Sequence, residues 1–265
     1  MKKKNIINRF TENLELAGYS PRSIQSYKSS VLRLQRFFNK PLEDINEEEL
    51  RQYWLACKDE FGWSAASLRI SYSGIKHFFN KTLVRAWPLL GEVKFKREET
   101  LPTILSTQEV KLIIDSLDTF PNRAFYLTLY SLGLRLQEAL NLKIGDILTH
   151  RGLVHVHSGK GARDRVVPLP LITLLTLREY YKTHRNPMWL FPALGHENGK
   201  YASTAKKPRS GGSVQEALQR TLKRLKFKKH VHPHVFRHAY ATFLYPFFPV
   251  NWQIALQVLY VYSLN

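Results

Sequence analysis

The helical periodicity of this chain stops near residue 84 and resumes near residue 104, and this interruption constrains the fold more than any other feature. Within it, Trp87-Pro88 and Leu101-Pro102 place prolines that a continuous helix does not tolerate. Breaks of this kind are typical of a linker between domains. We therefore predict a helical domain at residues 1–85, a linker at residues 86–103 and a second domain at residues 104–265.

The charge of the chain limits its partners. There are 40 Lys and Arg residues against 21 Asp and Glu, which gives a formal net charge of +19. Such an excess favours a polyanionic partner, and nucleic acid fits better than a membrane because no apolar run reaches transmembrane length. Cys57 is the single cysteine, and the first residues lack the apolar core of a secretory signal. We expect a cytoplasmic protein that handles nucleic acid and does not enter a membrane.

The first domain has the pattern of short amphipathic helices. Ser20-Pro21 is a helix start, Asn46 and Glu49 have the spacing of a capping box, and a further helix is predicted from Ser64. Basic side chains lie off the apolar stripes and are expected to face solvent, His77 among them. Those that we predict to contact DNA phosphates are Lys28, Arg33, Arg69 and Lys76.

The second domain begins with helices and a sharp break. Ser106 and Glu109 form a predicted capping box, and a helix from Pro121 ends at Gly133, a residue suited to a left-handed cap. A short helix follows at once, with Arg135 at its start. The break therefore presents an arginine at a helix N-terminus.

A small β-structure comes next. Residues 153–157 and 165–169 alternate like strands, and the glycine-flanked residues 158–164 form the tip of a hairpin between them. A helix is predicted at residues 171–181, a mobile loop at residues 199–212 and a capping box at residues 213–216 that opens another helix. The predicted fold class is mainly α with a small β-hairpin or sheet (α+β).

A basic motif lies near the end of the chain. Pro233 suits the first turn of a helix, and His234 and Arg237, three residues apart, share one face of it. The guanidinium can donate to two phosphate oxygens while the imidazole supplies a further donor or a proton. This pairing suits a phosphodiester whose charge grows during reaction.

Three motifs, taken together and in this order, resemble the tyrosine recombinase (phage integrase) family, of the Xer or integron-integrase type. They are residues 130–140 (YSLGLRLQEAL) with Asp146, residues 159–169 (GKGARDRVVPL) and residues 234–242 (HVFRHAYAT). The resemblance covers nearly the whole chain. It implies an N-terminal helical core-binding (SAM-like) domain that clamps DNA, followed by a catalytic domain.

The resemblance also implies roles for particular residues. Arg135 and Arg237 would bind the non-bridging oxygens of the scissile phosphate, Lys160 would protonate the departing deoxyribose oxygen, and His234 would assist proton transfer. A tyrosine would hold the DNA end as a phosphotyrosyl link, so no cofactor is expected. The implied partner is double-stranded DNA, on which an active protein would assemble as a dimer or tetramer. Further basic residues expected at the DNA are Arg163, Lys206 and Lys207.

The chain departs from the family pattern after Thr242. Residues 245–249 (YPFFP) replace a glycine-containing turn, and the position of the nucleophile lies beyond Asn265. Tyr260 and Tyr262 do not fall at that position, and we expect Tyr240 to fill the core. The sequence thus predicts a site-specific DNA recombinase or integrase impaired by truncation before its tyrosine. One alternative is an inactive DNA-binding remnant of a recombinase, and a weaker one is an RNA-associated structural protein.

A dense group of histidines raises the question of a metal site. His234 and His238 have the i, i+4 spacing that suits zinc, and His230 and His232 lie close in sequence. No carboxylate or cysteine nearby completes a ligand set, and the surroundings are strongly cationic. We therefore predict no metal site here.

Overall fold

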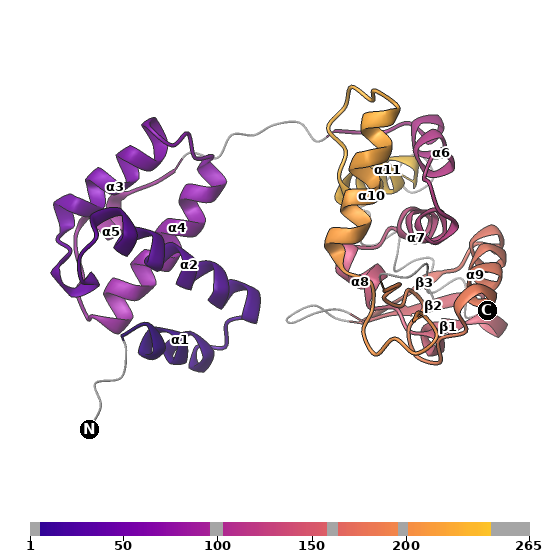
Figure 1. Cartoon of the computed structure of the whole chain (residues 1–265), viewed down its shortest axis with the longest axis horizontal. Helices are drawn as coiled ribbons and strands as arrows, with labels where there is room; N and C mark the ends of the chain where they lie inside the picture. The colour runs from indigo at the N-terminus through magenta and orange to yellow at the C-terminus, as the bar shows by residue number, and fades with distance from the viewer. Residues whose placement is uncertain (1–5, 96–102, 158–163, 196–200, 245–265) are drawn as a thin grey trace. The chain divides into compact units, whose positions relative to one another are not determined.

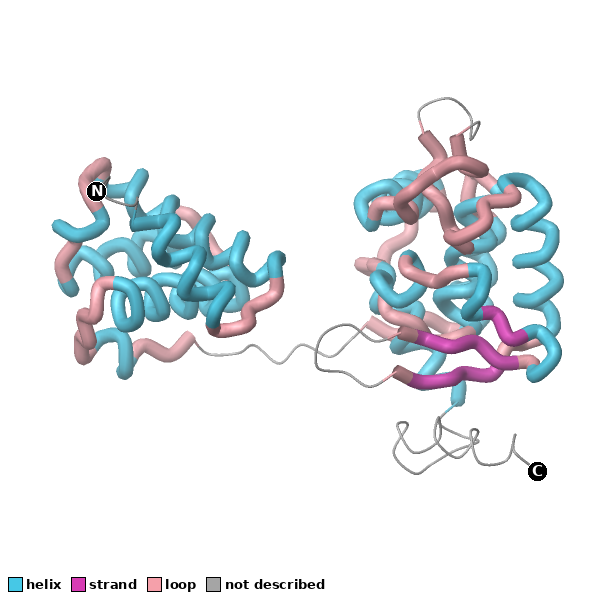
Figure 2. Tube along the Cα trace, turned by 90° about the horizontal axis from the view of Figure 1, so that it is seen from below, coloured by secondary structure: helices cyan, strands magenta, loops and turns pink. Residues whose placement is uncertain are grey.

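The computed structural model describes residues 6–95, 103–157, 164–195 and 201–244. Lys160, Arg163, Tyr260 and Tyr262 lie outside these residues. The chain divides into two compact units, residues 1–100 and residues 101–265, and each is described here by itself. Both are mainly helical and the second holds one small sheet (Figure 1 and Figure 2), which confirms the predicted α+β fold class. None of the helices in the described ranges has the length and apolar character needed to cross a bilayer.

The first unit is a group of helices around one apolar core. Its elements are α1 (Ile6–Leu16), α2 (Pro21–Phe38), the 3₁₀ turn η1 (Leu42–Asp44), α3 (Glu47–Asp59), α4 (Ala65–His77), the π-helical turn η2 (Phe78–Thr82) and α5 (Leu89–Glu92). The three predicted helix starts are observed, because the side chains of Ser20, Asn46 and Ser64 each accept a hydrogen bond from a backbone N–H in the first turn. Phe10 and Phe78 pack edge to face in the core, with ring centroids 5.2 Å apart.

Helices α2 and α4 approach closely where they cross. A Cβ on Gly74 would lie 2.9 Å from the Cα of Tyr27, so the crossing requires a glycine. The prediction that His77 faces solvent is only partly right, because the residue is half-buried. Its ring lies 5.9 Å from Phe10 and 5.5 Å from Tyr19, and burial lowers its pKa. Its position in the last turn of α4 places it between these aromatic rings, where a neutral imidazole is favoured.

The second unit surrounds a buried helix, α7. Its elements are α6 (Thr107–Asp115), α7 (Phe120–Ser131), α8 (Leu136–Leu140), η3 (Ile144–Asp146), β1 (Ile147–Leu148), η4 (Thr149–Arg151), β2 (Leu153–Val156), β3 (Arg165–Pro168), α9 (Leu171–His184), α10 (Gly211–Arg224) and α11 (Pro233–Leu244). Helix α7 contacts α6, α9 and α11, and Phe125, Tyr126 and Leu129 on it are fully buried. Burying each side chain of this size contributes roughly 1.5–3 kcal/mol, so α7 fixes its three neighbours in place.

The sheet is antiparallel with the strand order β1-β2-β3. Val154 pairs with Val167, and both face the core together with Val156. The two-residue strand β1, which pairs Ile147 with Val154, is too short to show a period of two, so the sequence does not predict it. The predicted hairpin strands are present as β2 and β3.

Helix α10 starts earlier than predicted. The expected capping box at residues 213–216 is wrong, because Ser210 is the N-cap and its Oγ accepts a hydrogen bond from the N–H of Ser213 at 3.1 Å. Glu216 pairs instead with Arg220 one turn on, at 2.7 Å. In the preceding connection, the side-chain amide of Asn186 donates to the carbonyl oxygens of Ala202 and Ala205, which ties the described part of the predicted loop to the end of α9.

The end of α7 depends on the absence of a side chain at Gly133. This residue has a φ of +56°, and a Cβ built on it would lie 2.7 Å from Cε1 of Tyr240 on α11. Gly133→Ala is therefore expected to destabilise the second unit in two ways. The left-handed backbone costs about 1 kcal/mol for a non-glycine residue, and the Tyr240 ring must also move. Urea unfolding of the full chain measures the loss.

The matched control is Gly152→Ala. Gly152 has nearly the same φ, +62°, but no atom lies within 4 Å of a Cβ built there. This substitution should cost only the backbone term, so Gly133→Ala should be more destabilising by on the order of 1 kcal/mol or more. Equal losses in the two variants would contradict the predicted collision with Tyr240.

Candidate active site

Arg135 is placed by the break between α7 and α8. Gly133 ends α7, the chain turns, and Arg135 becomes the N-cap residue of α8. Its backbone N–H donates to Glu138 Oε2 at 2.8 Å and its guanidinium donates to Glu138 Oε1 at 2.7 Å. Half of the Arg135 side chain remains exposed, 50 % by relative area, so the pairing with Glu138 orients the guanidinium without covering it.

Glu138 is the centre of the site. Its side chain is only 6 % exposed, and Arg165 on β3 donates to both carboxylate oxygens, at 2.9 Å and 2.7 Å. Burial alone would raise its pKa, but the hydrogen bonds from Arg165 and Arg135 outweigh burial and lower the pKa to about 2. Neither Glu138 nor Arg165 was among the residues predicted from the sequence for this site. The R-x-x-E spacing was the available signal for Glu138, whereas nothing in the sequence pairs Arg165 with it.

Helix α11 brings the other predicted residues to the same place. Arg237 is half-buried and donates to the carbonyl oxygen of Gly133 at the α7–α8 break. Burial lowers the pKa of Arg237, and the nearby charges of Arg135 and Arg165 lower it further. Guanidinium groups from three separate elements therefore lie close enough to repel one another. An anion bound among them would relieve that repulsion.

His234 lies exposed one turn before Arg237 on α11. Burial of part of its ring lowers its pKa, and the charges of His238, Arg237 and Arg135 lower it further. The imidazole is therefore neutral at pH 7, with one nitrogen that donates and one that accepts. Three of the four predicted catalytic residues, Arg135, His234 and Arg237, come together, and the fourth, Lys160, lies outside the described residues.

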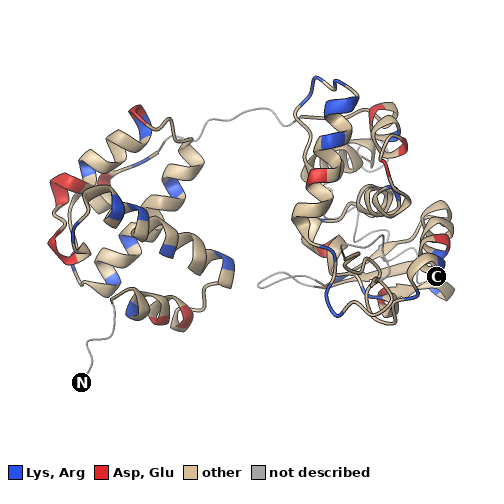
Figure 3. Ribbon diagram, in the orientation of Figure 1, with Lys and Arg blue, Asp and Glu red and all other residues tan. Residues whose placement is uncertain are grey.

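The predicted DNA-binding residues have varied environments. Arg33 and the pair Lys206 and Lys207 are exposed, and the Arg33 guanidinium lies 5.5 Å from the centroid of the Trp63 ring. The others in the described part, Lys28, Arg69 and Lys76, are half-buried. Figure 3 marks the positions of Lys and Arg along helices of both units, with few acidic positions between them on α2 and α10. A role for these residues in DNA binding stays a prediction.

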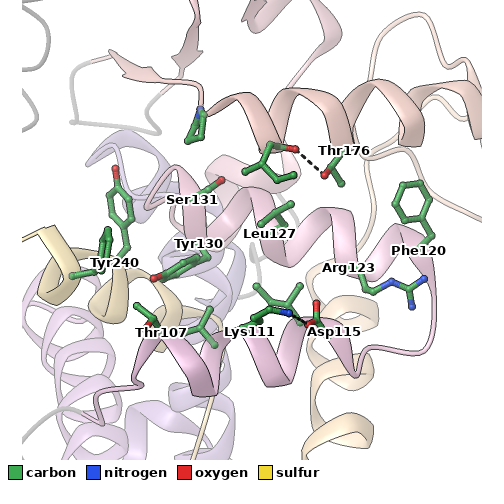
Figure 4. A pocket seen from close by; sticks show the side chains of 15 residues that line it. Thr107, Lys111, Asp115, Phe120, Arg123, Leu127, Tyr130, Ser131, Thr176 and Tyr240 are labelled. Atoms are coloured by element: carbon green, nitrogen blue, oxygen red, sulfur yellow. Dashed lines mark hydrogen bonds and ion pairs between the residues drawn. The ribbon is translucent and has the colours of Figure 1, made fainter.

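A separate apolar groove of about 770 Å³ lies between α6, α7, α9 and α11. Figure 4 shows Leu127, Tyr130 and Tyr240 among its lining side chains. Burial raises the pKa of Tyr240, whose ring packs on Gly133 and lies 6.2 Å from that of Tyr130. The groove is lined mainly by carbon and lies apart from Glu138, so it is not where the charged groups meet.

The protein thus has a helical unit followed by an α+β unit, and arginines converge beside a histidine in the second unit. This organisation is that of a two-domain integrase, and the family comparisons agree. A family model described as the phage integrase family matches residues 103–246, and one described as the phage integrase N-terminal SAM-like domain matches residues 6–89. The chain therefore belongs to the phage integrase family.

Proteins with similar sequences align with most of this chain. It is 31 % identical over 239 residues to the Sinorhizobium fredii protein y4qK, covering 89 % of this chain and 74 % of that protein. It is 30 % identical over 245 residues to the tyrosine recombinase XerA of Pyrococcus furiosus, covering 91 % and 80 %.

Solved structures share the fold. A lambda integrase dimer bound to a COC′ core site aligns with a TM-score of 0.72 and 18 % identity, over 96 % of this chain and 93 % of that one. The XerH site-specific recombinase in a pre-cleavage complex aligns with a TM-score of 0.55 and 20 % identity, over 86 % and 68 %. At these identities the comparison establishes the fold alone.

The buried carboxylate makes a testable prediction about acid stability. Glu138 has its pKa lowered from 4.5 to about 2, so its contribution to stability is complete above pH 4.5 and is lost as the pH falls toward 2. Glu138→Gln should lower the free energy of unfolding at pH 7 by on the order of 3 kcal/mol, because two guanidinium groups lose their carboxylate. It should also flatten the dependence of stability on pH between about 4.5 and 2. Urea unfolding over a pH series measures both effects.

Glu179→Gln is the control for this prediction. Glu179 pairs with Lys182 on the surface of α9 with 62 % of its side chain exposed, so its loss should change stability by no more than about 0.5 kcal/mol. An acid profile of Glu138→Gln that parallels the wild type would show that Glu138 is not the buried anion of this site.

Proposed function

We propose that this chain binds duplex DNA and holds one backbone phosphate between Arg135 and Arg237, as the strand-exchange site of a site-specific recombinase. The observation that supports this most directly is the convergence of Arg135, Arg165 and Arg237 around one buried carboxylate, with a neutral His234 beside them. A single phosphodiester has the charge and the oxygen geometry to accept from such a cluster.

The chemistry follows from the placement of these groups. Arg135 and Arg237 would donate to the two non-bridging oxygens, and their charge is worth most in the transition state, where charge on those oxygens increases. Arg165 would act indirectly: it holds the carboxylate of Glu138, and that carboxylate orients the guanidinium of Arg135. Neutral His234 can hold or pass a proton at the phosphate. Lys160 would protonate the departing oxygen as general acid.

Three tyrosines of the second unit are poorly placed to act as the nucleophile of the cleavage step. Tyr240 is the tyrosine that interacts electrostatically with Arg237, yet it packs on Gly133 and burial raises its pKa. Tyr126 donates its hydroxyl to the carbonyl oxygen of Val214, and Tyr180 is fully buried with its pKa raised to about 12 by burial. We therefore infer that none of these three tyrosines cleaves DNA efficiently, and we propose that the chain is impaired in cleavage. The alternative is a protein that binds recombination sites without cutting them.

The solved relatives suggest the partner and the assembly. Lambda integrase has been captured as a dimer on a core site and as a tetramer on a Holliday junction. By analogy, the partner proposed for this chain is double-stranded DNA, gripped by both units, with self-assembly on the DNA. Residues 1–85 would supply Arg33 and Lys28 to the phosphates of one side of the duplex.

The first experiment measures phosphate binding by Arg237. Binding of the full chain to a fluorescent duplex is followed over a series of salt concentrations. Affinity should fall steeply with salt, and Arg237→Ala should weaken binding and reduce the slope of log K against log salt by about 1. Arg178→Ala, which removes an exposed arginine of α9, is the control and should match the wild type. Equal effects of the two substitutions would mean that Arg237 does not contact a phosphate.

The second experiment tests cleavage. A duplex selected from a randomised pool by repeated binding is nicked near its centre, so that a cut releases a short strand and traps any covalent complex. The expected result is no covalent adduct, or a trace of one. A strong adduct that mass spectrometry maps to Tyr240, Tyr260 or Tyr262 would overturn the inference about the nucleophile while leaving the phosphate site intact.

A further inference from the structure

Two histidines and two aspartates gather on one face of the sheet. The register pairs Ile147 with Val154 and Val156 with Arg165. Continued by one residue, it sets Asp146 opposite His155 and Asp164 opposite His157. Because side chains on a strand alternate and opposite residues share a face, all four project from the same side.

The distances within this group are short. His157 Nε2 lies 3.0 Å from Asp146 Oδ1, and His157 Nδ1 lies 3.1 Å from Asp164 Oδ2. His155 Nε2 lies 3.5 Å from the same Asp164 oxygen, and the two imidazole rings are 4.2 Å apart. One ligand atom from each of Asp146, His155 and His157 lies within 4.8 Å of the others. Within the described part of the chain, no other three His, Cys, Asp or Glu residues meet this condition.

We propose that Asp146, His155 and His157 bind a divalent transition-metal ion with the chemistry of Zn²⁺, and that Asp164 orients His157 from behind. Zinc takes imidazole nitrogen and carboxylate oxygen ligands at about 2.0–2.2 Å, which separates neighbouring ligand atoms by roughly 3.4 Å in a tetrahedron. The separation between His157 Nε2 and Asp146 Oδ1 is 3.0 Å, and the ligand atom of His155 lies within 4.8 Å of both residues, so the three side chains are near that spacing. A water molecule would complete the fourth position.

The surroundings of the three ligands favour this assignment. Asp146 is buried, and its Oδ2 accepts from the backbone N–H of Lys143 at 2.8 Å, which leaves Oδ1 facing His157. The carboxylate of Asp164 at Nδ1 of His157 matches the arrangement in which a second carboxylate fixes the tautomer of a metal-binding histidine. In a chain of net charge +19, two carboxylates at one point make a local site for a cation.

The histidines near the end of the chain, for which the sequence predicts no metal site, are a poorer site. The rings of His234 and His238 are 6.3 Å apart, and those of His230 and His232 are 5.9 Å apart. The charges of Arg237 and Arg135 act on His234, which disfavours a second cation there. The sheet site differs because its two histidines are paired with acids.

The position of the sheet site gives the ion a structural effect. His157 immediately precedes residues 158–163 and Asp164 immediately follows them, so an ion bound here joins both ends of that segment to Asp146. Lys160 and Arg163 belong to the segment. Metal binding itself does not depend on the proposed recombinase function, whereas an effect on Lys160 would.

The test is a titration of the full chain with Zn²⁺ after removal of metals by a chelator, with bound metal counted by elemental analysis and affinity measured by calorimetry. One equivalent is expected. His155→Gln and His157→Gln should each weaken binding at least tenfold, and Asp164→Asn should weaken it by roughly tenfold because it only orients a ligand. Both histidines are at least partly exposed, so circular dichroism should show that the variants fold.

Two matched variants separate this site from others. His150→Gln removes an exposed histidine of η4 beside the same sheet, and His230→Gln removes a histidine of the other cluster; both should bind Zn²⁺ as the wild type does. No bound zinc in the wild type, undiminished binding in His157→Gln, or loss of binding in His230→Gln would each overturn the proposal. Co²⁺ used in place of Zn²⁺ should give an absorption band that disappears in His155→Gln and persists in His150→Gln.

Discussion

The carboxylate of Glu138 is the interaction on which the rest of the site depends. It is the buried anion that neutralises Arg165 on β3 and orients Arg135 at the start of α8, so one side chain joins the sheet to the helical part of the unit. A buried carboxylate without these partners would be costly, and so would two guanidinium groups without it. The arrangement leaves the outer half of Arg135 exposed, where it can meet an anion from solvent.

The backbone around Gly133 links this ion-pair network to α11. The left-handed turn ends α7, lets the ring of Tyr240 pack directly on the backbone, and presents a carbonyl oxygen to Arg237. Arg237 and Arg135, far apart in sequence, are therefore both fixed by one break between two helices. Because both side chains are fixed in this way, the unit can hold their positive charges close together despite the repulsion between them.

The second unit thus holds two clusters of charged side chains, which suit ions of opposite charge. The arginine cluster suits an anion, whereas the His–Asp group on the sheet, with Asp146 and His157 at its centre, suits a cation. The strands β2 and β3 connect them, since Arg165 opens β3 directly after Asp164. The apolar groove beside Tyr240 belongs to neither, because its lining supplies few polar atoms.

The sequence by itself determined what depends on local order. Caps at Ser20, Asn46 and Ser106, the helix break at Gly133 and the hairpin were predictable because turn chemistry is written in neighbouring residues. The meeting of Arg135, His234 and Arg237 was implied only by the resemblance of three ordered motifs to a known family. Tertiary structure alone decided the rest. That Arg165 shares Glu138, that His77 turns inward, that α10 begins at Ser210, and that Asp146 meets His155 and His157 across β1 and β2 all depend on strand register and helix packing. Such contacts join residues through space, and no spacing along the chain encodes them.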